Sequence, residues 1–394
     1  MCFQGGKARN YADMSLKSQT KPPKGPHILV LAIVLLSIIP AIGEAAVLGW
    51  GIAHGFSGKA LRDGVDFWAG GFLASHGEVA LLFDPVAYRA FLHGAFGALP
   101  VHMWSYAPNY LLLVSGFAGL SPWHAILLFD LLSLLGLALV LRLAGQSWWL
   151  IAAVLLSPAA LENCLSGQNA ALVTALIGGG LLLLPTRPRL GGVLVGLASI
   201  KPQLGLVLPL HLARRAPIAV LCAILSAILL AAAALWAFGA QPWVQFWHIT
   251  RPAMTSVLTT GEPKDFFNGL VSVFAAIRPL GVGAAFTAQG LVSLAAVILA
   301  ALVKKPAPVL ILAVLASPYV HSYDLLCAAL AVALLVQNRL TTGFALGEKP
   351  LFLAAWIIPG LVLWLPVVTF IVPIVLALLL ASALRRGPVA PCDS

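Results

Sequence analysis

Residues 28–54 form the first long apolar segment of the chain and read ILVLAIVLLSIIPAIGEAAVLGWGIAH. This segment exceeds the roughly 20 apolar residues that a transmembrane helix needs, so it predicts a span that brings the chain to one membrane face. The polar stretch that follows, about 55 to 104, contains the phrase Gly64-Val65-Asp66-Phe67-Trp68. Asp66 is therefore expected at the boundary between lipid and water. A carboxylate there suits a general base acting on lipid-linked substrates, and an Asp that caps a helix is the alternative.

The composition indicates a membrane protein with many spans. Of the 394 residues, 61% are hydrophobic and 9% are charged, whereas a soluble domain carries about 25% charged residues. So much apolar surface exceeds what one buried core holds, and the remainder must face lipid. About ten to twelve segments approach the length of a spanning helix. The sequence therefore predicts an all-α polytopic protein with one membrane domain at 27–386 and a short C-terminal tail at 387–394.

The distribution of charge predicts the orientation of the chain. The net charge of +10 comes from basic residues scattered at the ends of apolar segments, a pattern that does not indicate nucleic-acid binding. Five of these residues precede the first span: Lys7, Arg9, Lys17, Lys21 and Lys24. By the positive-inside rule, residues 1–26 form a cytoplasmic tail, and their polar, proline-rich composition predicts disorder. The first span remains as an anchor in the cell (inner) membrane, and the loop at 55–104 is extracytoplasmic.

Further segments follow along the chain. Amphipathic stretches at 66–76 and 84–96 predict two short interfacial helices in the first loop, the second capped by Asp84 and begun by Pro85. A second polar loop is expected at 239–268. The expected spans lie at 106–121, 123–141, 148–165 (broken at Ser157-Pro158), 169–184, 190–212, 216–238, 269–280, 282–303, 307–318, 321–337, 350–365 and 367–384. Some of these are short enough to be half-helices.

The segment at 190–212 allows two topologies. It is interrupted by Lys201-Pro202-Gln203 and bracketed by the pairs Arg187/Arg189 and Arg214/Arg215. A simple span would place one of the two basic pairs outside, against the positive-inside rule. A broken or re-entrant element would keep both pairs inside. The sequence leaves this choice open.

Five ionisable residues fall within apolar segments: Asp130, Glu162, Lys201, His321 and Asp324. A charge at membrane depth costs about 2.5 to 3.5 kcal/mol on insertion scales, so these side chains are expected to face the bundle interior or a watery cavity. Each of them serves either as an internal ion pair between helices or as part of a functional site.

Three polar interruptions are the strongest candidates for substrate contacts. A lysine beside a proline break, as in Lys201-Pro202-Gln203, offers a point charge to a phosphate, although it could also reach the nearest headgroups. The break at Ser317-Pro318-Tyr319 leads to His321 and Tyr323, and an imidazolium there could bind phosphate; a packed histidine is the alternative. Gly167-Gln168-Asn169 offers neutral donors and acceptors for sugar hydroxyls, or forms a capped turn.

The sequence does not contain the motifs that mark several classes of function. The sequence contains no G-x-x-x-x-G-K-[ST] loop, no Gly-rich dinucleotide fingerprint and no His/Glu zinc signature, so neither a metal nor another cofactor is expected. The loops leave no room for a domain that binds nucleotide sugars. A sugar donor would therefore have to arrive attached to lipid. The five cysteines are far apart and show neither metal nor disulfide spacing: Cys2, Cys164, Cys222, Cys327 and Cys392.

The order and spacing of six short motifs resemble glycosyltransferase family 87 over about residues 60 to 340. The motifs are Gly64-Val65-Asp66-Phe67, Phe83-Asp84-Pro85, Tyr106-Ala107-Pro108, Gly167-Gln168-Asn169, Lys201-Pro202 and Ser317-Pro318-Tyr319-Val320-His321. That family comprises mannosyltransferases of the GT-C type that use polyprenyl-phosphate-mannose. The chain departs from the family pattern at Trp68 and Gly70-Gly71, where a Tyr pair is frequent, and at Phe83. These departures leave the acceptor and the sugar open.

The resemblance implies a GT-C fold and a metal-independent displacement with inversion. It implies Asp66 as the catalytic base, and it places Lys201 and His321 near the phosphate of a lipid-linked donor. Contacts to the substrates are expected from Tyr106, Gln168, Asn169, Gln203 and Tyr323. The partners implied are a polyprenyl-phosphate sugar donor, an extracytoplasmic lipid or glycan acceptor, and membrane lipids.

Two other functions are alternatives to a transferase. A secondary transporter or lipid flippase would use the buried charges as a pathway for ions or headgroups. A scaffold for envelope assembly would need none of them for chemistry. An early external loop rich in aromatic residues favours the transferase.

Overall fold

The computed structural model describes residues 63–385 except 98, 100, 101, 263–266, 268, 363 and 364, together with scattered residues between 32 and 53. Both predicted tails, at 1–26 and 387–394, and most of the first span lie outside the described residues. The described elements are all helices, apart from an isolated bridge between Leu270 and His321. The prediction of an all-α polytopic membrane protein is confirmed.

Four helical segments are long and apolar enough to cross a membrane: α5 (Pro122–Leu143), α12 (Pro217–Phe238), α17 (Val282–Leu302) and Ser322–Thr342, which combines η10 (Ser322–Leu325) with α19 (Leu326–Thr342). The bent pair α6 (Trp148–Leu155) and α7 (Pro158–Ser166), with 47° between its halves, could form a fifth span. Shorter apolar helices occupy Ala170–Leu183, Pro188–Ile200, Pro306–Ala316 and Val372–Leu384. These elements correspond to most of the spans expected from the sequence.

Several of these segments consist of more than one helix. Ala170–Leu183 combines α8 (Ala170–Thr174), the π-helix η5 (Ala175–Gly179) and α9 (Gly180–Leu183), and Pro188–Ile200 combines α10 (Pro188–Leu197) with η6 (Ala198–Ile200). Next come η7 (Pro202–Gly205) and α11 (Leu208–Arg215). The C-terminal part contains α16 (Val273–Ile277), η9 (Arg278–Leu280), α18 (Pro306–Ala316), α20 (Glu348–Val362), η11 (Pro366–Phe370) and α21 (Val372–Leu384).

Proline explains the breaks predicted within the apolar segments. Pro158 begins α7, and the hydroxyl of Ser157 accepts a hydrogen bond from the Ala160 amide at the start of that helix. Pro202 likewise begins η7 directly after Lys201. A proline has no amide hydrogen and clashes with the preceding turn, so each apolar segment divides at this point. The polar residues beside the breaks thereby come to lie inside the helix bundle.

The segment around Lys201 is a broken element that returns to the side from which it came. Helix α10 packs on α12 in parallel, because Gly192 contacts Ala219 and Gly196 contacts Ala223. The start of α10 at Pro188 therefore lies beside the start of α12. Since α11 ends at Arg215, just before α12 begins, α10 runs away from this end and α11 runs back to it.

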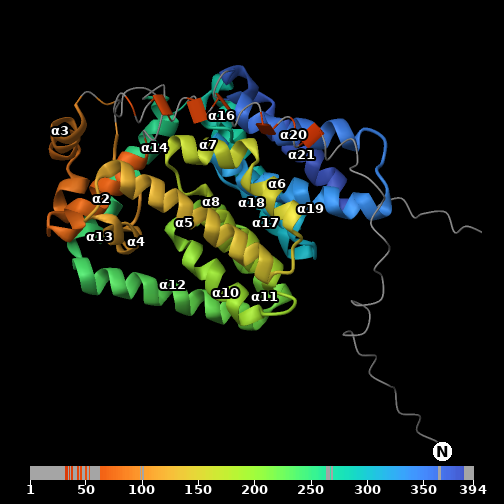
Figure 1. Ribbon diagram of the computed structural model, residues 1–394, viewed down its shortest axis with the longest axis horizontal. Helices are drawn as coiled ribbons and strands as arrows, with labels where there is room; N and C mark the ends of the chain where they lie inside the picture. Colours follow the sequence, from red (N-terminus) through yellow and green to blue (C-terminus); the bar gives the residue numbers. More distant parts are fainter. Residues whose placement is uncertain are drawn as a thin grey trace, which may run out of the picture.

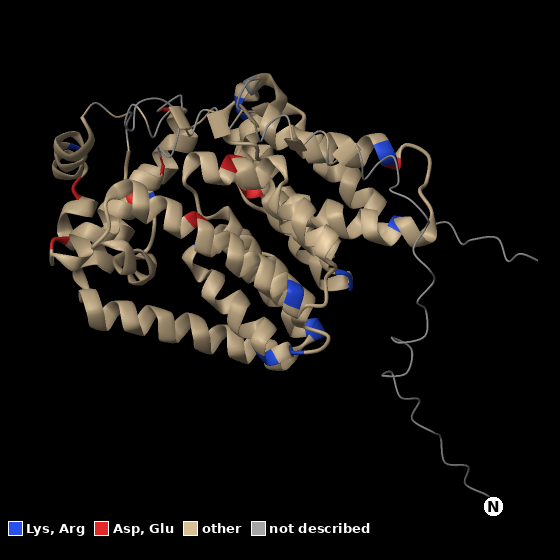
Figure 2. Cartoon of the chain, in the orientation of Figure 1, with Lys and Arg blue, Asp and Glu red and all other residues tan. Residues whose placement is uncertain are grey.

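The two basic pairs that bracket this element consequently lie at one end of the bundle. Arg215 donates hydrogen bonds to the carbonyl oxygens of Leu302 and Val303 at the C-terminal end of α17, at 2.6 and 3.2 Å. Figure 2 shows most Lys and Arg residues toward the lower right, where α5, α10 and α11 meet, and most Asp and Glu residues toward the left and top. The structure therefore favours the re-entrant topology over a simple span.

The first loop forms both of the short helices that were predicted for it. These are α2 (Gly64–Ser75) and α3 (Pro85–Phe96), which lie at the left end of the molecule in Figure 1, with η2 (Val79–Phe83) between them. The carboxylate of Asp84 caps α3 by accepting hydrogen bonds from the Val86 and Ala87 amides. Both helices agree with the prediction.

The expected span at 106–121 is wrong. This stretch forms the short helices η3 (Pro108–Tyr110), α4 (Leu111–Val114) and η4 (Ser115–Phe117). A helical run of this length rises only about 15 Å, half the thickness of the hydrocarbon core. The stretch at 269–280 is too short for a span as well, since it contains only α16 and η9. An apolar segment was mistaken for a span in each case because helices buried within a bundle are equally apolar.

The second polar loop, expected at 239–268, is largely helical. It contains α13 (Gln241–Gln245), the π-helix η8 (Phe246–Thr250) and α14 (Arg251–Thr260). The side chains of Val244 and Trp247 are 50% and 59% exposed. Aromatic and aliphatic side chains exposed in this way are typical of a helix that lies in the membrane interface.

The contact between α10 and α12 gives a test of the re-entrant element. A Cβ atom at Gly192 would clash with the backbone carbonyl of Ala219, which has little freedom to move. Gly192→Ala should therefore destabilise the purified protein by about 1–3 kcal/mol, as overpacking does. The control is Gly136→Ala on α5, where an added Cβ meets nothing within 4 Å. Equal thermal melting of the two variants in detergent would contradict this packing.

Candidate active site

A cavity of about 940 Å³ gathers nearly all of the residues that the sequence singled out. Its lining includes Asp66, Tyr106, Gln168, Lys201, Gln203, His321 and Tyr323. Asn169 is not among the lining residues but contacts one of them, Lys201. These residues are up to 257 positions apart in sequence (66 to 323), and the folding of separate helices brings them to one cavity.

Asp66 lies in the first turn of α2 and faces this cavity. Its Oδ1 accepts a hydrogen bond of 2.6 Å from the Tyr88 hydroxyl, and its Oδ2 lies 3.0 Å from Nδ1 of His102. The carboxylate is therefore held by side chains rather than used as a helix cap. Its side chain retains 14% exposure, so a substrate hydroxyl can reach it.

Tyr88 and His102 orient this carboxylate. Tyr88 comes from α3 and is buried, and its burial together with the adjacent Asp66 raises the pKa of its hydroxyl well above the usual value. The phenol thus stays protonated and acts as a hydrogen-bond donor at neutral pH. Two donors on one carboxylate fix its position before a substrate arrives.

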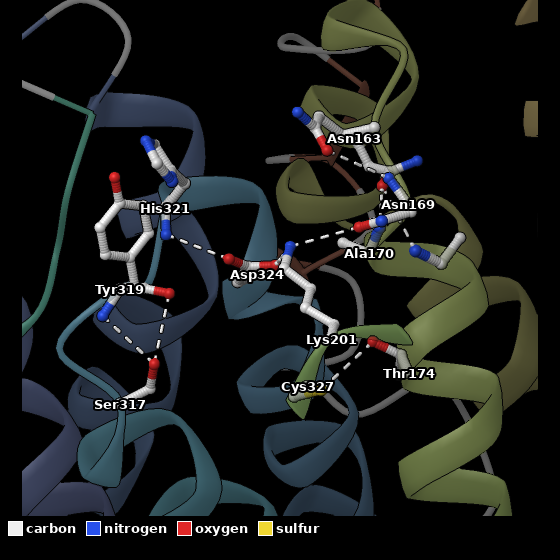
Figure 3. Close-up of polar contacts among 12 residues, drawn as sticks. Asn163, Asn169, Ala170, Thr174, Lys201, Ser317, Tyr319, His321, Asp324 and Cys327 are labelled. Atoms are coloured by element: carbon white, nitrogen blue, oxygen red, sulfur yellow. Dashed lines mark hydrogen bonds and ion pairs between the residues drawn. The ribbon is translucent and has the colours of Figure 1, made fainter. Parts of the chain in front are cut away.

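Lys201 lies at the junction between η6 and η7, and its ammonium group has two polar partners. The Nζ atom is 2.5 Å from Oδ1 of Asp324 and 3.2 Å from Oδ1 of Asn169, and it lies 5.1 Å from the centre of the Tyr323 ring. Figure 3 shows Lys201 between Asn169 and Asp324. Lys201 therefore forms the internal ion pair that was one of its two expected roles, and it also lines the cavity.

His321 is tied to the same carboxylate. Its backbone amide donates a hydrogen bond of 3.1 Å to Oδ2 of Asp324, as Figure 3 shows, and its ring stacks on Tyr323 with 8° between the ring planes. Asp324 therefore connects the two residues that were expected to bind phosphate. Through one oxygen it holds Lys201, and through the other it holds the backbone of His321.

A hydrogen-bonded chain that ends on the carboxylate of Asp63 joins the two walls of the cavity. The Tyr106 hydroxyl donates to Oε1 of Gln168 at 3.3 Å, and Nε2 of Gln168 donates to Oδ2 of Asp63 at 3.0 Å. Gly167 adopts a φ of +67°, and its Cα approaches the backbone of Gly64 so closely that a side chain would not fit. The turn after α7 is thus anchored against the start of α2.

The other buried acids lie outside this cavity. Glu162 accepts a short hydrogen bond from the Ser322 hydroxyl, and Asp130 is buried on α5 without a hydrogen-bond partner for its carboxylate among the described residues. No group of three or more His, Cys, Asp or Glu side chains in the described part of the chain has the arrangement of a metal site. The polar residues of the cavity suit hydrogen bonding and proton transfer.

A sequence model of glycosyltransferase family 87 matches residues 104–336, which is more than half of the chain. The chain belongs to this family. No curated relative and no solved structure matches it. This glycosyltransferase is a multi-pass membrane enzyme, and its family membership favours sugar transfer over the transporter and scaffold alternatives.

The family match covers one part of the cavity and not the other. Lys201, His321 and the Gln168-Asn169 pair lie within residues 104–336 of the glycosyltransferase. Asp66, with its partners Tyr88 and His102, lies before the match begins. The assignment of a base to Asp66 therefore depends on the geometry of the cavity and on the resemblance of the short motif around it.

Sequence reasoning did not find several residues of the site: Asp63, Tyr88, His102, Trp247 and Arg251. Tyr88 falls in the predicted helix at 84–96 and Trp247 in the second polar loop, and the two loops carried no signal that they would meet. A histidine at the end of the first loop was the one available hint, because histidine is a frequent partner of a catalytic carboxylate.

The bond between Tyr88 and Asp66 can be tested in this glycosyltransferase. Tyr88→Phe keeps the buried ring and removes one donor from the carboxylate. Because a hydrogen bond to a charged group contributes about 1.5–3 kcal/mol, the melting temperature should fall, and the rate of sugar transfer by the folded variant should fall by about tenfold or more because the carboxylate is less firmly oriented. An unchanged rate, measured with saturating substrates, would show that this bond does not contribute to the reaction.

Proposed function

We propose that this glycosyltransferase moves a sugar, with mannose the first candidate, from a polyprenyl-phosphate donor to an extracytoplasmic lipid or glycan acceptor. One observation carries the proposal: a single cavity is lined both by the oriented carboxylate of Asp66 and by the cationic side of the Lys201–Asp324 pair with His321. A transfer from a lipid-phosphate donor to an acceptor hydroxyl needs both features: a base for the nucleophile and hydrogen-bond donors for the leaving phosphate.

The reaction follows from these two groups. An acceptor hydroxyl gives its proton to a carboxylate oxygen of Asp66 as its own oxygen attacks the anomeric carbon. The bond between that carbon and the phosphate oxygen breaks, and its electron pair leaves with the lipid phosphate. Lys201 and His321 donate hydrogen bonds to the charge that grows on this oxygen. A single displacement inverts the anomeric configuration.

The ion pair determines how Lys201 contributes. A lysine bound only to Asp324 and Asn169 retains hydrogen-bonding capacity, since an ammonium group has three donors. The third donor is available to a phosphate oxygen. Tyr106, Gln168, Asn169, Gln203 and Tyr323 supply the neutral groups and the aromatic ring that sugar hydroxyls and a pyranose face require.

The apolar part of the cavity supports a lipid-linked donor. Ile200, Phe246, Met254 and Val257 line it beside the polar groups. A water-soluble sugar nucleotide would gain nothing from such a wall, whereas an isoprenoid chain is stabilised by contact with it.

The charge distribution supports an orientation for the enzyme. Basic residues concentrate at the end of the bundle where α10 begins and α11 ends (Figure 2). By the positive-inside rule this end faces the cytoplasm, so the cavity opens on the extracytoplasmic side of the inner membrane. The basic residues at 1–26 put the N-terminus on the cytoplasmic side by the same rule. Chemistry on that side suits a donor whose sugar is already attached to lipid.

The role of Asp66 can be tested by Asp66→Asn, which keeps the shape of the side chain and removes the base. With radiolabelled polyprenyl-phosphate-mannose and a membrane lipid extract, the purified variant should lose transfer by at least about 100-fold, the lower range of general-base contributions. Its melting temperature should stay close to that of the wild type.

The matched control for Asp66→Asn is Asp84→Ser, which also removes a carboxylate from the first loop. A serine retains the cap of α3, and Asp84 does not line the cavity. This control should transfer sugar at the wild-type rate. Near-wild-type turnover by Asp66→Asn would exclude the proposed base.

The role of Lys201 can be tested by separating its charge from its structural pairing. Lys201→Met alone leaves Asp324 buried without its partner, which typically costs about 3–5 kcal/mol of stability. The double variant Lys201→Met/Asp324→Asn should recover much of that stability and still show a raised KM for the lipid donor, with a smaller change for the acceptor. An unchanged donor KM in the stable double variant would refute the phosphate contact.

A further inference from the structure

Six basic residues gather at one end of the helix bundle, away from the cavity. Two of them lie at or just before the start of each of three helices, α10, α12 and α18. All six side chains are exposed. Together they form the basic patch: Arg187, Arg189, Arg214, Arg215, Lys304 and Lys305.

Packing between helices brings the three turns of the basic patch together. Leu184, directly after α9, packs on a buried cluster that includes the junction between α11 and α12. In that junction, Arg215 donates hydrogen bonds to the carbonyl oxygens of Leu302 and Val303, which come just before Lys304. Figure 2 shows Lys and Arg residues toward the lower right, where α5, α10 and α11 meet. The six cations therefore belong to one region of the surface.

No carboxylate balances these charges among the described residues. The stretches 180–195, 207–221 and 298–311, which contain the three turns, have no Asp or Glu. The ion pairs that Lys and Arg form with carboxylates in the described part of the chain are those of Lys201 and Arg339, outside the patch. Neighbouring like charges repel each other within the Debye length, about 8 Å at physiological salt, so a bound anion would relieve this cost.

The convergence of the patch is a consequence of the re-entrant element. The positive-inside rule concerns the number of Lys and Arg residues in a loop and the side on which that loop lies. It does not require separate loops to meet. A simple span at 190–212 would place Arg187 and Arg189 at the opposite end from Arg214 and Arg215, whereas α10 and α11 together return the second pair to the first.

The basic patch borders the lipid-facing surface of the bundle. An exposed apolar side chain lies close in sequence to each pair of cations: Leu190 on α10, Ile218 on α12 and Leu302 on α17. At the end of α5, the guanidinium carbon of Arg142 lies 5.5 Å from the centre of the ring of Trp148, which is also exposed. Exposed tryptophan beside a basic residue is typical of the boundary between headgroups and acyl chains. The patch thus offers both charge and apolar contact.

We propose that the basic patch binds the phosphate headgroup of an anionic phospholipid, at the end of the bundle that the proposed orientation assigns to the cytoplasm. Clustered Lys and Arg at the end of membrane helices attract anionic headgroups, and the apolar side chains beside them contact the acyl chains. The bound lipid bridges three turns and stabilises the folded enzyme. This inference goes beyond the proposed function and does not depend on the sugar donor or acceptor.

The first measurement uses the wild-type protein, purified in a neutral detergent. Cardiolipin added to the micelles should raise its melting temperature more than the same mass of phosphatidylcholine, because a ligand of the folded state stabilises it. Added salt should reduce this difference, since it screens exposed charges. Equal shifts for the two lipids would overturn the inference without any variant.

A triple variant, Arg189→Gln/Arg214→Gln/Lys305→Gln, then removes one cation from each turn. It keeps Arg215, whose hydrogen bonds hold the end of α17. Its affinity for fluorescently labelled cardiolipin should fall by about tenfold or more, as expected when three cations are lost near an anionic headgroup. In neutral detergent without lipid it should melt no lower than the wild type, because it loses repulsion and no hydrogen bond.

The matched control is Arg89→Gln/Lys349→Gln/Arg385→Gln. It removes the same number of positive charges from exposed positions on α3, on α20 and after α21, outside the three turns. This control should bind cardiolipin as the wild type does. Equal losses of affinity in the two triple variants would show a general effect of net charge and overturn the site.

Two soluble anions distinguish a lipid from other ligands of a basic surface. Inorganic phosphate, at the phosphate concentration of the cardiolipin, should not shift the melting temperature, because it cannot contact the apolar border. A shift as large as that of cardiolipin would overturn the lipid as the ligand. A shift with polyglutamate and none with cardiolipin would assign the patch to an acidic protein and overturn the inference as well.

Discussion

The ion pair between Lys201 and Asp324 is the contact on which the site depends. Either charge alone would be costly inside a helix bundle, and the pair is tolerated because Asn169 and the His321 amide each add a hydrogen bond to it. Each partner comes from a different broken element. The pair thus links the junctions after α10 and α18, where η7 also packs on α18.

Proline breaks make this arrangement possible. A continuous transmembrane helix satisfies its own backbone and exposes side chains only, whereas a break at Pro202 or Pro158 opens the backbone and turns adjacent polar residues inward. The element α10–α11 returns to its starting side and carries Lys201 at its innermost point. The same construction explains why apolar segments of ordinary appearance contain lysine, histidine and carboxylates without exposing them to lipid.

The part of the cavity around Asp66 and Arg251, its rim, is formed by helices from the two loops rather than by broken membrane segments. Helices α2, α3 and α13–α14 come from two loops far apart in the sequence, and they place Asp66 and Arg251 in the lining of the cavity. Hydrogen bonds from Tyr88 and His102 give the carboxylate a fixed orientation. The deep part of the site thus supplies buried, paired charge, and the rim supplies groups that meet substrates from the lipid phase.

The sequence by itself determined the membrane class, the helical fold, the positions of the proline breaks and a set of candidate site residues, nearly all of which line the cavity. Apolar length, proline and isolated charge act locally, so their effects can be predicted residue by residue. Only the tertiary structure decided that 106–121 is not a span, that the element around Lys201 is re-entrant, and that Tyr88, His102 and Arg251 reach the site. Those outcomes depend on contacts between distant helices, such as Gly192 on Ala219, and an apolar pattern does not say whether lipid or protein covers it.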